Sequence, residues 1–256
     1  MDAMIFAAGL GTRLKPLTDS RPKALVEVGG VPMLERVAGR LIAAGADHLV
    51  INAHHFASQI ADFVSERKGF GVRSDISFET ELLETGGGVL HAEPYLAGRP
   101  FIIHNVDVLS DLDIKRFAAE ALSHPGDLCT LVVSKRKSSR QLLFDRDMRL
   151  VGRLDLRDGH VDSPFGEIDP SQYEQYAFAG IHFVSESVFA IMRSLGFGGR
   201  FPIFDFYLRA AADHTIRGYV QDGFRMMDMG KIEALEQAGP FAAELEKERF
   251  CDCAKK

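Results

Sequence analysis

The first 23 residues constrain the fold more than any other stretch. The apolar run Met4-Ile5-Phe6 leads through two alanines to Gly9 and Gly11. Glycine accepts positive φ and lets a ligand approach backbone N–H groups, and successive N–H groups in such a turn form an anion-binding concavity. Four cations follow within eleven residues: Arg13, Lys15, Arg21 and Lys23. The stretch predicts a phosphate-binding loop at the end of a first strand.

Two common phosphate-binding motifs do not fit this loop. A dinucleotide-binding fingerprint needs a third glycine where the chain has Leu14, and a P-loop needs Lys-Ser/Thr where Thr12-Arg13 stands. Glycines after a strand also occur in plain turns, so the glycines alone leave that alternative open. The neighbouring cations and the Pro22-Lys23 step favour the phosphate site.

The composition is that of a soluble globular protein, with 46% hydrophobic and 26% charged residues in a chain of 256. No apolar run approaches the roughly 20 residues of a membrane span, and the start lacks the basic-then-apolar layout of a secretory signal. The net charge of −6 argues against nucleic acid as a partner. We therefore expect a cytoplasmic protein without membrane or nucleic-acid partners, as a monomer or small homo-oligomer.

The three cysteines do not form a disulfide framework. Cys129 lies in an apolar run and is expected to be a core thiol. Cys251 and Cys253 are expected in a solvated tail, because a metal site requires about four ligands and these are only two.

Short apolar strands alternate with amphipathic helices through the first 105 residues, which predicts a parallel sheet with helices on both faces. Glycines 86–88 are expected to open a helix and to expose their N–H groups at its N-terminus. Another helix is expected over residues 111–122, and a small antiparallel excursion over 141–165. We expect one domain over residues 1–240, followed by a C-terminal helix or tail over 241–256.

Two aspartates are candidate metal ligands. Asp107 follows the buried strand 101–104, and ligands in open α/β sheets bind outside the carboxyl ends of strands. Asp228 ends a late strand before Gly230. Mg²⁺ prefers one or two carboxylates together with substrate phosphates and water. A turn or cap role is the alternative for Asp107, and helix capping is the alternative for Asp228.

These features together resemble the signature of the sugar-1-phosphate nucleotidyltransferases. In that family a strand precedes Ala-Ala-Gly-x-Gly-Thr-Arg, with Pro-Lys about ten residues on, here Ala7 to Arg13 and Pro22-Lys23. The late strand Ala179-Gly180-Ile181 also matches. The chain departs from the family pattern at Ala24, where a proline is more common, and at Val106, which replaces a glycine.

The resemblance implies a Rossmann-like nucleotidyltransferase fold, with a mixed, mostly parallel sheet flanked by helices and a small antiparallel insert. The implied reaction joins an NTP and a sugar 1-phosphate into an NDP-sugar and pyrophosphate. Arg13 and Lys23 would be catalytic, and Asp107 and Asp228 would hold Mg²⁺. The implied nucleotide-binding residues are Ala7, Ala8, Gly9, Gly11, Thr12, Glu84, Thr85 and Gly86. The implied sugar-binding residues are Asn105 and Gly180.

The form Glu84-Thr85-Gly86-Gly87-Gly88 is most similar to short stand-alone enzymes that use UTP with N-acetylmuramate 1-phosphate, a cell-wall sugar. Transfer from GTP to mannose 1-phosphate is the alternative substrate pair. A catalytically silent subunit that binds nucleotide-sugars is the alternative from another class. The complete set Arg13, Lys23, Asp107 and Asp228 argues against it. The sugar choice is expected to lie in residues 140–205.

Overall fold

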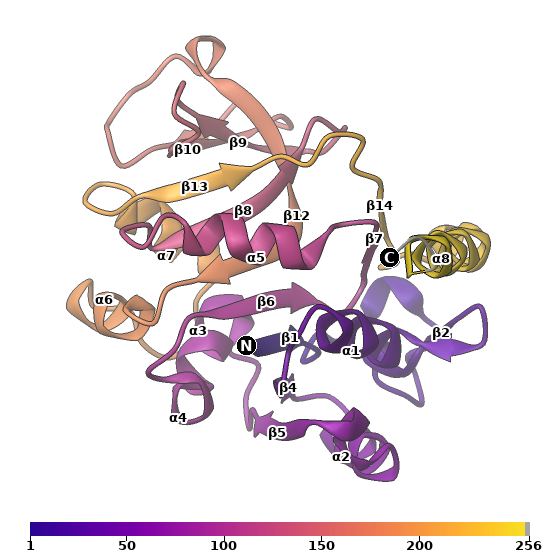
Figure 1. Ribbon diagram of the computed structural model, residues 1–256. Coiled ribbons are helices and arrows are strands. Elements are labelled where there is room, and N and C mark those ends of the chain that lie inside the picture. Colours follow the sequence, from indigo (N-terminus) through magenta and orange to yellow (C-terminus); the bar gives the residue numbers. More distant parts are fainter. Residues whose placement is uncertain (254–256) are drawn as a thin grey trace.

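Four short strands form the parallel centre of one sheet in the computed structural model, which describes residues 1–253 and the side chains of residues 1–247. They lie in the order β6-β1-β4-β5 (Figure 1). Their bounds are β1 (Asp2–Phe6), β4 (His48–Ala53), β5 (Arg73–Phe78) and β6 (Phe101–Asn105). Strand β1 is buried on both faces, so it is apolar along almost its whole length.

The second half of the sheet is mainly antiparallel and joins the first through one long strand, β12. This strand pairs antiparallel with β6, β8 and β9. The bounds here are β8 (Cys129–Ser134), β9 (Arg140–Phe144), β10 (Leu150–Asp155), β11 (Val161–Asp162), β12 (Glu174–Val184) and β13 (Ile216–Tyr219). Strands β9, β10 and β11 confirm the antiparallel excursion predicted over 141–165. They continue the main sheet through β12.

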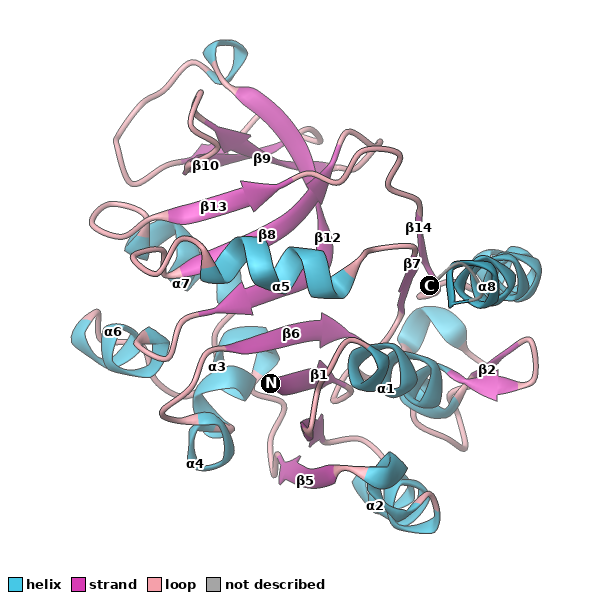
Figure 2. Cartoon of the chain, in the orientation of Figure 1, coloured by secondary structure: helices cyan, strands magenta, loops and turns pink. Residues whose placement is uncertain are grey.

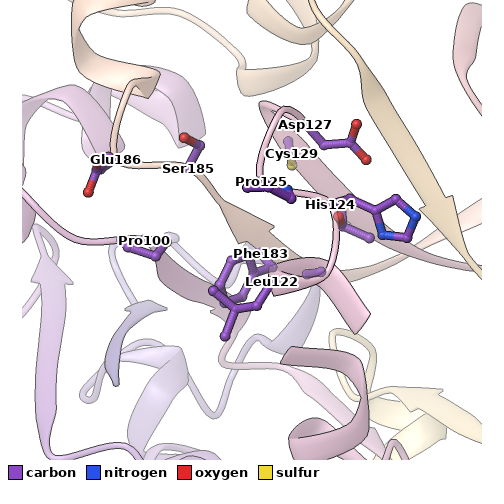
Figure 3. Close-up of a pocket in the computed structure, with 11 residues that line it drawn as sticks. Pro100, Leu122, His124, Pro125, Asp127, Cys129, Phe183, Ser185 and Glu186 are labelled. Atoms are coloured by element: carbon purple, nitrogen blue, oxygen red, sulfur yellow. The ribbon is translucent and has the colours of Figure 1, made fainter. Parts of the chain in front are cut away.

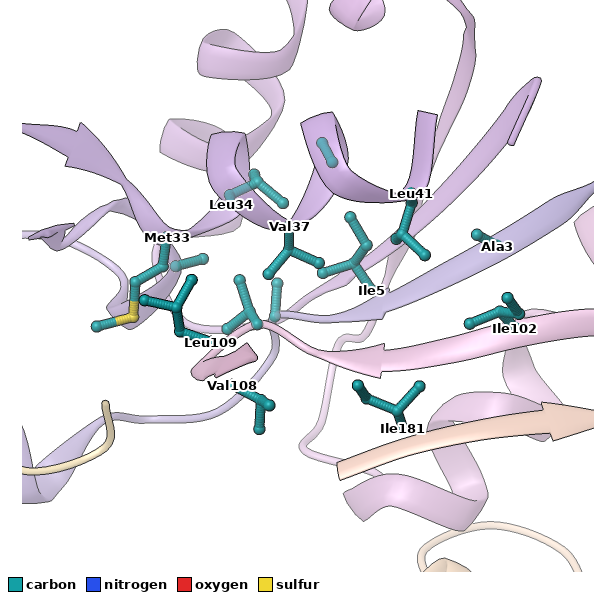
Figure 4. Close-up of a cluster of buried hydrophobic side chains, with 14 of the residues drawn as sticks. Ala3, Ile5, Met33, Leu34, Val37, Leu41, Ile102, Val108, Leu109 and Ile181 are labelled. Carbon is teal, nitrogen blue, oxygen red and sulfur yellow. The ribbon is translucent and has the colours of Figure 1, made fainter. Parts of the chain in front are cut away.

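Helices cover both faces of the sheet, as predicted (Figure 2). Helices α1, α2, α5 and α8 contribute to one hydrophobic core, and α3, α4, α6 and α7 to the other. Successive β1 side chains alternate between these cores, with Ile5 in the first (Figure 4) and Met4 in the second. The bounds are α1 (Met33–Ala43), α2 (Ala57–Glu66), α3 (Glu84–His91), α4 (Glu93–Leu96), α5 (Ile114–Leu122), α6 (Val188–Ser194), α7 (Ile203–Ala210) and α8 (Ile232–Cys253).

Helix α5 begins three residues later than the predicted residue 111. The Asp113 carboxylate caps it by accepting the N–H of Arg116 at 3.0 Å. Asp111 lies before the helix and pairs with Arg225 at 2.7 Å, which ties this segment to the strand that carries Asp228. The two aspartates therefore have different roles, although both stand at the start of the same apolar pattern.

Two small two-stranded sheets lie beside the main one. One joins β2 (Glu27–Val28) to β3 (Val31–Pro32). The other pairs β7 (Val108–Ser110) antiparallel with β14 (Met226–Asp228). The second sheet brings a segment near the end of the chain beside the strand end that carries Asp107.

Several smaller expectations can be compared with the fold. Cys129 is buried, and burial raises the pKa of its thiol to about 12, so the predicted core thiol is confirmed. The side chains of Cys251 and Cys253 lie outside the described residues. Helix α8 runs across the boundary predicted at residue 240. No helix within residues 1–253 has both the length and the hydropathy that crossing a bilayer requires.

Candidate active site

A cavity of about 360 Å³ lies at the carboxyl ends of β1, β4 and β6. Four segments meet there: the loop after β1, the end of β4, the start of α3 and the end of β6. Many of the residues that the sequence predicts for the site line it, namely Ala7, Ala8, Gly9, Lys23, Glu84, Thr85, Asn105 and Asp107. The strand-end position expected for an α/β ligand site is therefore present.

The loop after β1 is held by a side chain that the sequence analysis missed. Asn52, buried at the end of β4, accepts the N–H groups of Ala7 and Ala8 on its Oδ1 at 2.7 and 3.3 Å. A Cβ at Gly9 would meet nothing within 4 Å, so the backbone there is open to a ligand. Ala7 and Ala8 therefore shape the cavity wall, while their own N–H groups are already satisfied.

Asn52 also connects this loop to the start of α3. Its Nδ2 donates to Oε1 of the buried Glu79 at 2.7 Å, and Glu79 Oε2 accepts the N–H of Leu83 at 3.0 Å. Two walls of the cavity are thus joined by one buried polar chain. The sequence feature that could have identified Asn52 is its position directly after the apolar strand 49–51.

Gly11 is required by the fold of the cationic loop. Its φ is +65°, and a Cβ there would come within 2.9 Å of both Lys23 Cβ and Thr18 Cγ2. The Thr18 hydroxyl donates to the Gly11 carbonyl at 2.9 Å. Gly11 thus lets the loop fold against Lys23. Among the described residues that line the cavity, neither Gly11 nor Thr12 is included, so their predicted nucleotide contacts remain predictions.

Four charged residues that the sequence singled out converge beside the cavity. Lys23 Nζ pairs with Asp107 Oδ2, and both side chains are largely buried. A Cβ placed on Gly230 would lie 2.7 Å from Arg13 Nη2, 2.8 Å from Asp228 Oδ1 and 3.0 Å from Asp107 Oδ2. Groups separated by more than 200 residues in the chain therefore surround one point. Gly230 leaves room for this convergence.

The β7–β14 ladder produces this arrangement. Asp228 pairs with Val108, and the N–H of Met229 donates to the carbonyl of Asp107 at 2.8 Å. The N–H of Gly230 donates to Asp228 Oδ1 at 2.8 Å, which orients that carboxylate. Asp228 therefore both accepts the Gly230 N–H in the turn before α8 and lies beside Asp107.

The two carboxylates fit the ligand set that Mg²⁺ prefers. Their oxygens lie on either side of one point, with cations nearby that suit phosphate oxygens. Within the described part of the chain, no group of three or more His, Cys, Asp or Glu side chains is placed to hold a metal ion. An ion on Asp107 and Asp228 would therefore complete its coordination with water and substrate.

The glycine triplet does not expose its N–H groups as the sequence analysis predicted. Helix α3 begins at Glu84, so the glycines lie inside its first turns, and all three are buried. The N–H groups of Gly86 and Gly87 donate to the carbonyl of Phe201 at 2.9 and 3.2 Å. The Gly86 amide is therefore not open to a ligand, because it already has a partner, and the contact between Gly86 and the nucleotide stays a prediction.

The glycines instead permit close packing between α3 and the segment before α7. A Cβ on Gly86 would collide with the Phe201 ring and lie 2.9 Å from the Phe201 carbonyl. A Cβ on Gly87 would collide with the carbonyl of Gly199. Glu84 and Thr85 line the cavity, and the Thr85 hydroxyl accepts the N–H of Ile203 at 2.9 Å.

We expect Gly86→Ala to destabilise the protein by about 1–3 kcal/mol, because the added methyl group overpacks the contact with Phe201. Urea denaturation would measure the change. Gly39→Ala in α1 is a matched control, because a Cβ there meets nothing within 4 Å. Alanine favours a helix over glycine by about 1 kcal/mol, so this control should lose no stability. Equal stabilities of Gly86→Ala and wild type would contradict the packing role.

Gly180 sits at an irregularity in β12 where the register against β8 shifts between Phe178 and His182. Its φ is +79°, and a Cβ there would lie 2.8 Å from Val108 Cγ2 and 3.0 Å from Asn105 Nδ2. The two predicted sugar-binding residues, Asn105 and Gly180, are therefore neighbours, and they lie beside the strand end that carries Asp107.

Two buried histidines lie behind the site. His104 on β6 bonds through Nδ1 to the carbonyl of Asn105 at 2.7 Å, and His182 on β12 bonds to the Tyr207 hydroxyl at 2.8 Å. Burial lowers their pKa values to about 4 and about 3. Both rings are therefore neutral at physiological pH and add no positive charge to the site.

A second cavity, of about 200 Å³, lies elsewhere, between the end of α5 and the end of β12 (Figure 3). Its titratable lining residues are His124, Asp127, Cys129 and Glu186, with no lysine or arginine among the described residues that form it. Asp127 is paired with Arg217 at 2.5 Å. Because no described lysine or arginine lines this second cavity to bind a triphosphate, the cavity at the strand ends is the better candidate for the active site.

Comparison with known proteins gives matches over most of the chain. A sequence model of the family described as Nucleotidyl transferase matches residues 2–144, more than half of the chain. The N-acetylmuramate alpha-1-phosphate uridylyltransferase of Caulobacter vibrioides is 32% identical over 236 residues, which cover 88% of this chain and 90% of that protein. The mannose-1-phosphate guanyltransferase of Gibberella zeae is 38% identical over 138 residues, 53% of this chain and 38% of that protein.

Solved structures share the fold. The inositol-1-phosphate CTP transferase from T. maritima superposes with a TM-score of 0.76 over 96% of each chain, at 17% sequence identity. At that identity the likeness concerns the fold alone. It supports the Rossmann-like nucleotidyltransferase architecture expected from the sequence.

Proposed function

The chain belongs to the nucleotidyl transferase family, and from this premise we propose that it transfers a nucleotidyl group from an NTP to a sugar 1-phosphate. The observation that carries the proposal is the convergence of Arg13, Lys23, Asp107 and Asp228 beside a cavity at the strand ends. Two cations and two carboxylates at one point suit a reaction between phosphates that also uses a divalent cation.

The proposed reaction is a displacement at the α-phosphorus of the NTP. An oxygen of the sugar phosphate forms a bond to that phosphorus while the bond to the bridging oxygen of pyrophosphate breaks, and pyrophosphate leaves with the electron pair. Lys23 lies at the cavity wall and would neutralise the reacting phosphates. Arg13 stands beside Gly230 and would hold the leaving pyrophosphate. Positioning and charge neutralisation are then the main contributions of the protein.

Asp107 and Asp228 are the proposed ligands of Mg²⁺. When bound there, the ion would neutralise charge on the phosphate oxygens. Because Lys23 is paired with Asp107, its ammonium group stands where it would meet the same phosphate oxygens. The Gly230 amide would keep Asp228 oriented throughout.

We further propose UTP and N-acetylmuramate 1-phosphate as the substrates. The name of the Caulobacter relative, which aligns over nearly the full length of both chains, supports this pair. Glu84 and Thr85, from the stretch that suggested the pair, line the cavity where the nucleotide would bind. GTP with mannose 1-phosphate is the second candidate, because the guanyltransferase relative matches 53% of the chain at higher identity.

A pyrophosphate-release assay with UTP, GTP, CTP and dTTP against a panel of sugar 1-phosphates tests this proposal. We expect release with several pairs and the highest kcat/KM for UTP with N-acetylmuramate 1-phosphate. A higher value for GTP with mannose 1-phosphate would favour the second candidate. Absence of release from every pair, alongside measurable nucleotide-sugar binding, would instead support a silent binding subunit.

A further inference from the structure

A basic cavity lies where β8 ends and β12 begins. It measures about 460 Å³, and its polar lining comes from Lys135, Arg136, Lys137, Ser138, Gln141 and Gln175. Three consecutive cations form one wall, in a protein whose net charge is −6. None of the described lining residues is acidic. The cavity therefore suits an anionic group.

Arg136 connects this cavity to the candidate active site. Its Nη2 donates to the carbonyl of Phe178 at 2.8 Å, two residues before Gly180, which lies against Asn105 and Val108. Partial removal from water lowers the pKa of the Arg136 guanidinium, and the negative charge of Asp228 opposes that effect. Arg136 thus lines the basic cavity and also contacts β12 two residues before Gly180, one of the residues proposed to bind the sugar.

The loop that carries the cations is held in place. The Gln141 side chain, itself buried, donates from Nε2 to the carbonyls of Arg136 and Ser138, each at 3.3 Å. Lys135 is neutralised by Glu174 at 2.5 Å. Lys137 makes no ion pair with any residue whose side chain is described. The charge available to a ligand therefore comes from Arg136 and Lys137.

We propose that Arg136 and Lys137 bind a carboxylate on the sugar 1-phosphate, and that they select acidic sugars over neutral ones. This inference rests on the proposed function, in which the phosphate of the sugar lies at Lys23 and Asp107. N-acetylmuramate differs from N-acetylglucosamine only by a lactyl ether that ends in a carboxylate. In this proposed arrangement the phosphate would lie at Lys23 and Asp107, the ring against Asn105 and Gly180, and the carboxylate at Arg136 and Lys137. An arginine fork matches a carboxylate with two parallel hydrogen bonds.

The test compares N-acetylmuramate 1-phosphate with N-acetylglucosamine 1-phosphate, each with UTP, in wild type, Arg136→Met and Lys137→Met. We expect each variant to lower kcat/KM for the acidic sugar roughly 10- to 100-fold, the range for one charged hydrogen-bond partner, with little change for the neutral sugar. Arg136→Lys keeps the charge without the fork and should fall between. Arg140→Gln is the matched control, because Arg140 lies in the same segment but pairs with Asp155 outside the cavity.

Calorimetric binding of N-acetylmuramate 1-phosphate to wild type and Lys137→Met adds a readout that needs no turnover. Equal losses of kcat/KM with both sugars would assign Arg136 and Lys137 to general phosphate binding. Unchanged kinetics would show that the two cations are solvated surface residues that do not bind the sugar. Either outcome overturns the inference. A wild type that uses only neutral sugars overturns it while leaving nucleotidyl transfer intact. Failure with every substrate pair would count against the proposed function itself.

Discussion

Replacing Lys23 by alanine should lower kcat/KM roughly 10²- to 10³-fold, the cost of removing one preorganised group that stabilises developing charge. Lys23 lines the cavity and pairs with Asp107, so the substitution removes positive charge where the reacting phosphates are proposed to lie. The assay is pyrophosphate release at saturating and limiting NTP.

Loss of Lys23 also leaves the largely buried Asp107 unpaired, which by itself destabilises a protein. The double variant Lys23→Ala/Asp107→Asn separates the two effects, because it should recover thermal stability without recovering activity. Lys15→Ala is the matched control: Lys15 is an exposed cation of the same loop, paired with Asp19 at 3.4 Å. Near-normal turnover of Lys23→Ala would remove Lys23 from the site.

The second large effect is expected for the carboxylates. Asp107→Asn and Asp228→Asn should each lower turnover roughly 10²- to 10⁴-fold, because charge stabilisation by a metal contributes several kcal/mol and each 1.4 kcal/mol is a factor of ten. The concentration of Mg²⁺ that gives half-maximal activity should rise in both variants. Chelation with EDTA should abolish wild-type activity, and added Mg²⁺ should restore it.

Asp19→Asn controls for the loss of a negative charge, since Asp19 is an exposed carboxylate in the loop after β1. It should resemble wild type in both turnover and Mg²⁺ dependence. If Asp228→Asn kept an unchanged Mg²⁺ dependence, Asp228 would act only as a turn residue through its hydrogen bond with Gly230. Wild-type activity that survives EDTA would argue against the metal altogether.

Much of the fold follows from local patterns along the chain. The apolar runs and amphipathic stretches of the first 105 residues form parallel strands and covering helices, as predicted. The family resemblance of the first loop was confirmed by the family match over residues 2–144. These predictions succeeded because they depend on periodicity and on residues that are neighbours in the sequence.

The errors concern partners that are distant in the sequence. The amides of Gly86 and Gly87 looked available, but Phe201 accepts them, and no local pattern near residue 86 indicates that residue 201 lies there. The start of α5 was misjudged because Asp111 bonds to Arg225 instead of capping the helix. Asn52 and Arg136 were missed because their roles depend on which strand ends lie together.

The sequence by itself determined the parallel core, the cationic glycine loop and the chemical types of the site residues, because backbone freedom, charge and hydrophobic periodicity are local properties. Only the tertiary structure decided which backbone amides remain open to a ligand and which cations lie beside Asp107 and Asp228. Arg13, Lys23, Asp107 and Asp228 meet because β14 pairs with β7 and the first loop folds over Gly11. The β7–β14 pairs join residues more than 100 positions apart, and long-range pairing of this kind depends on how the whole sheet and its two cores pack.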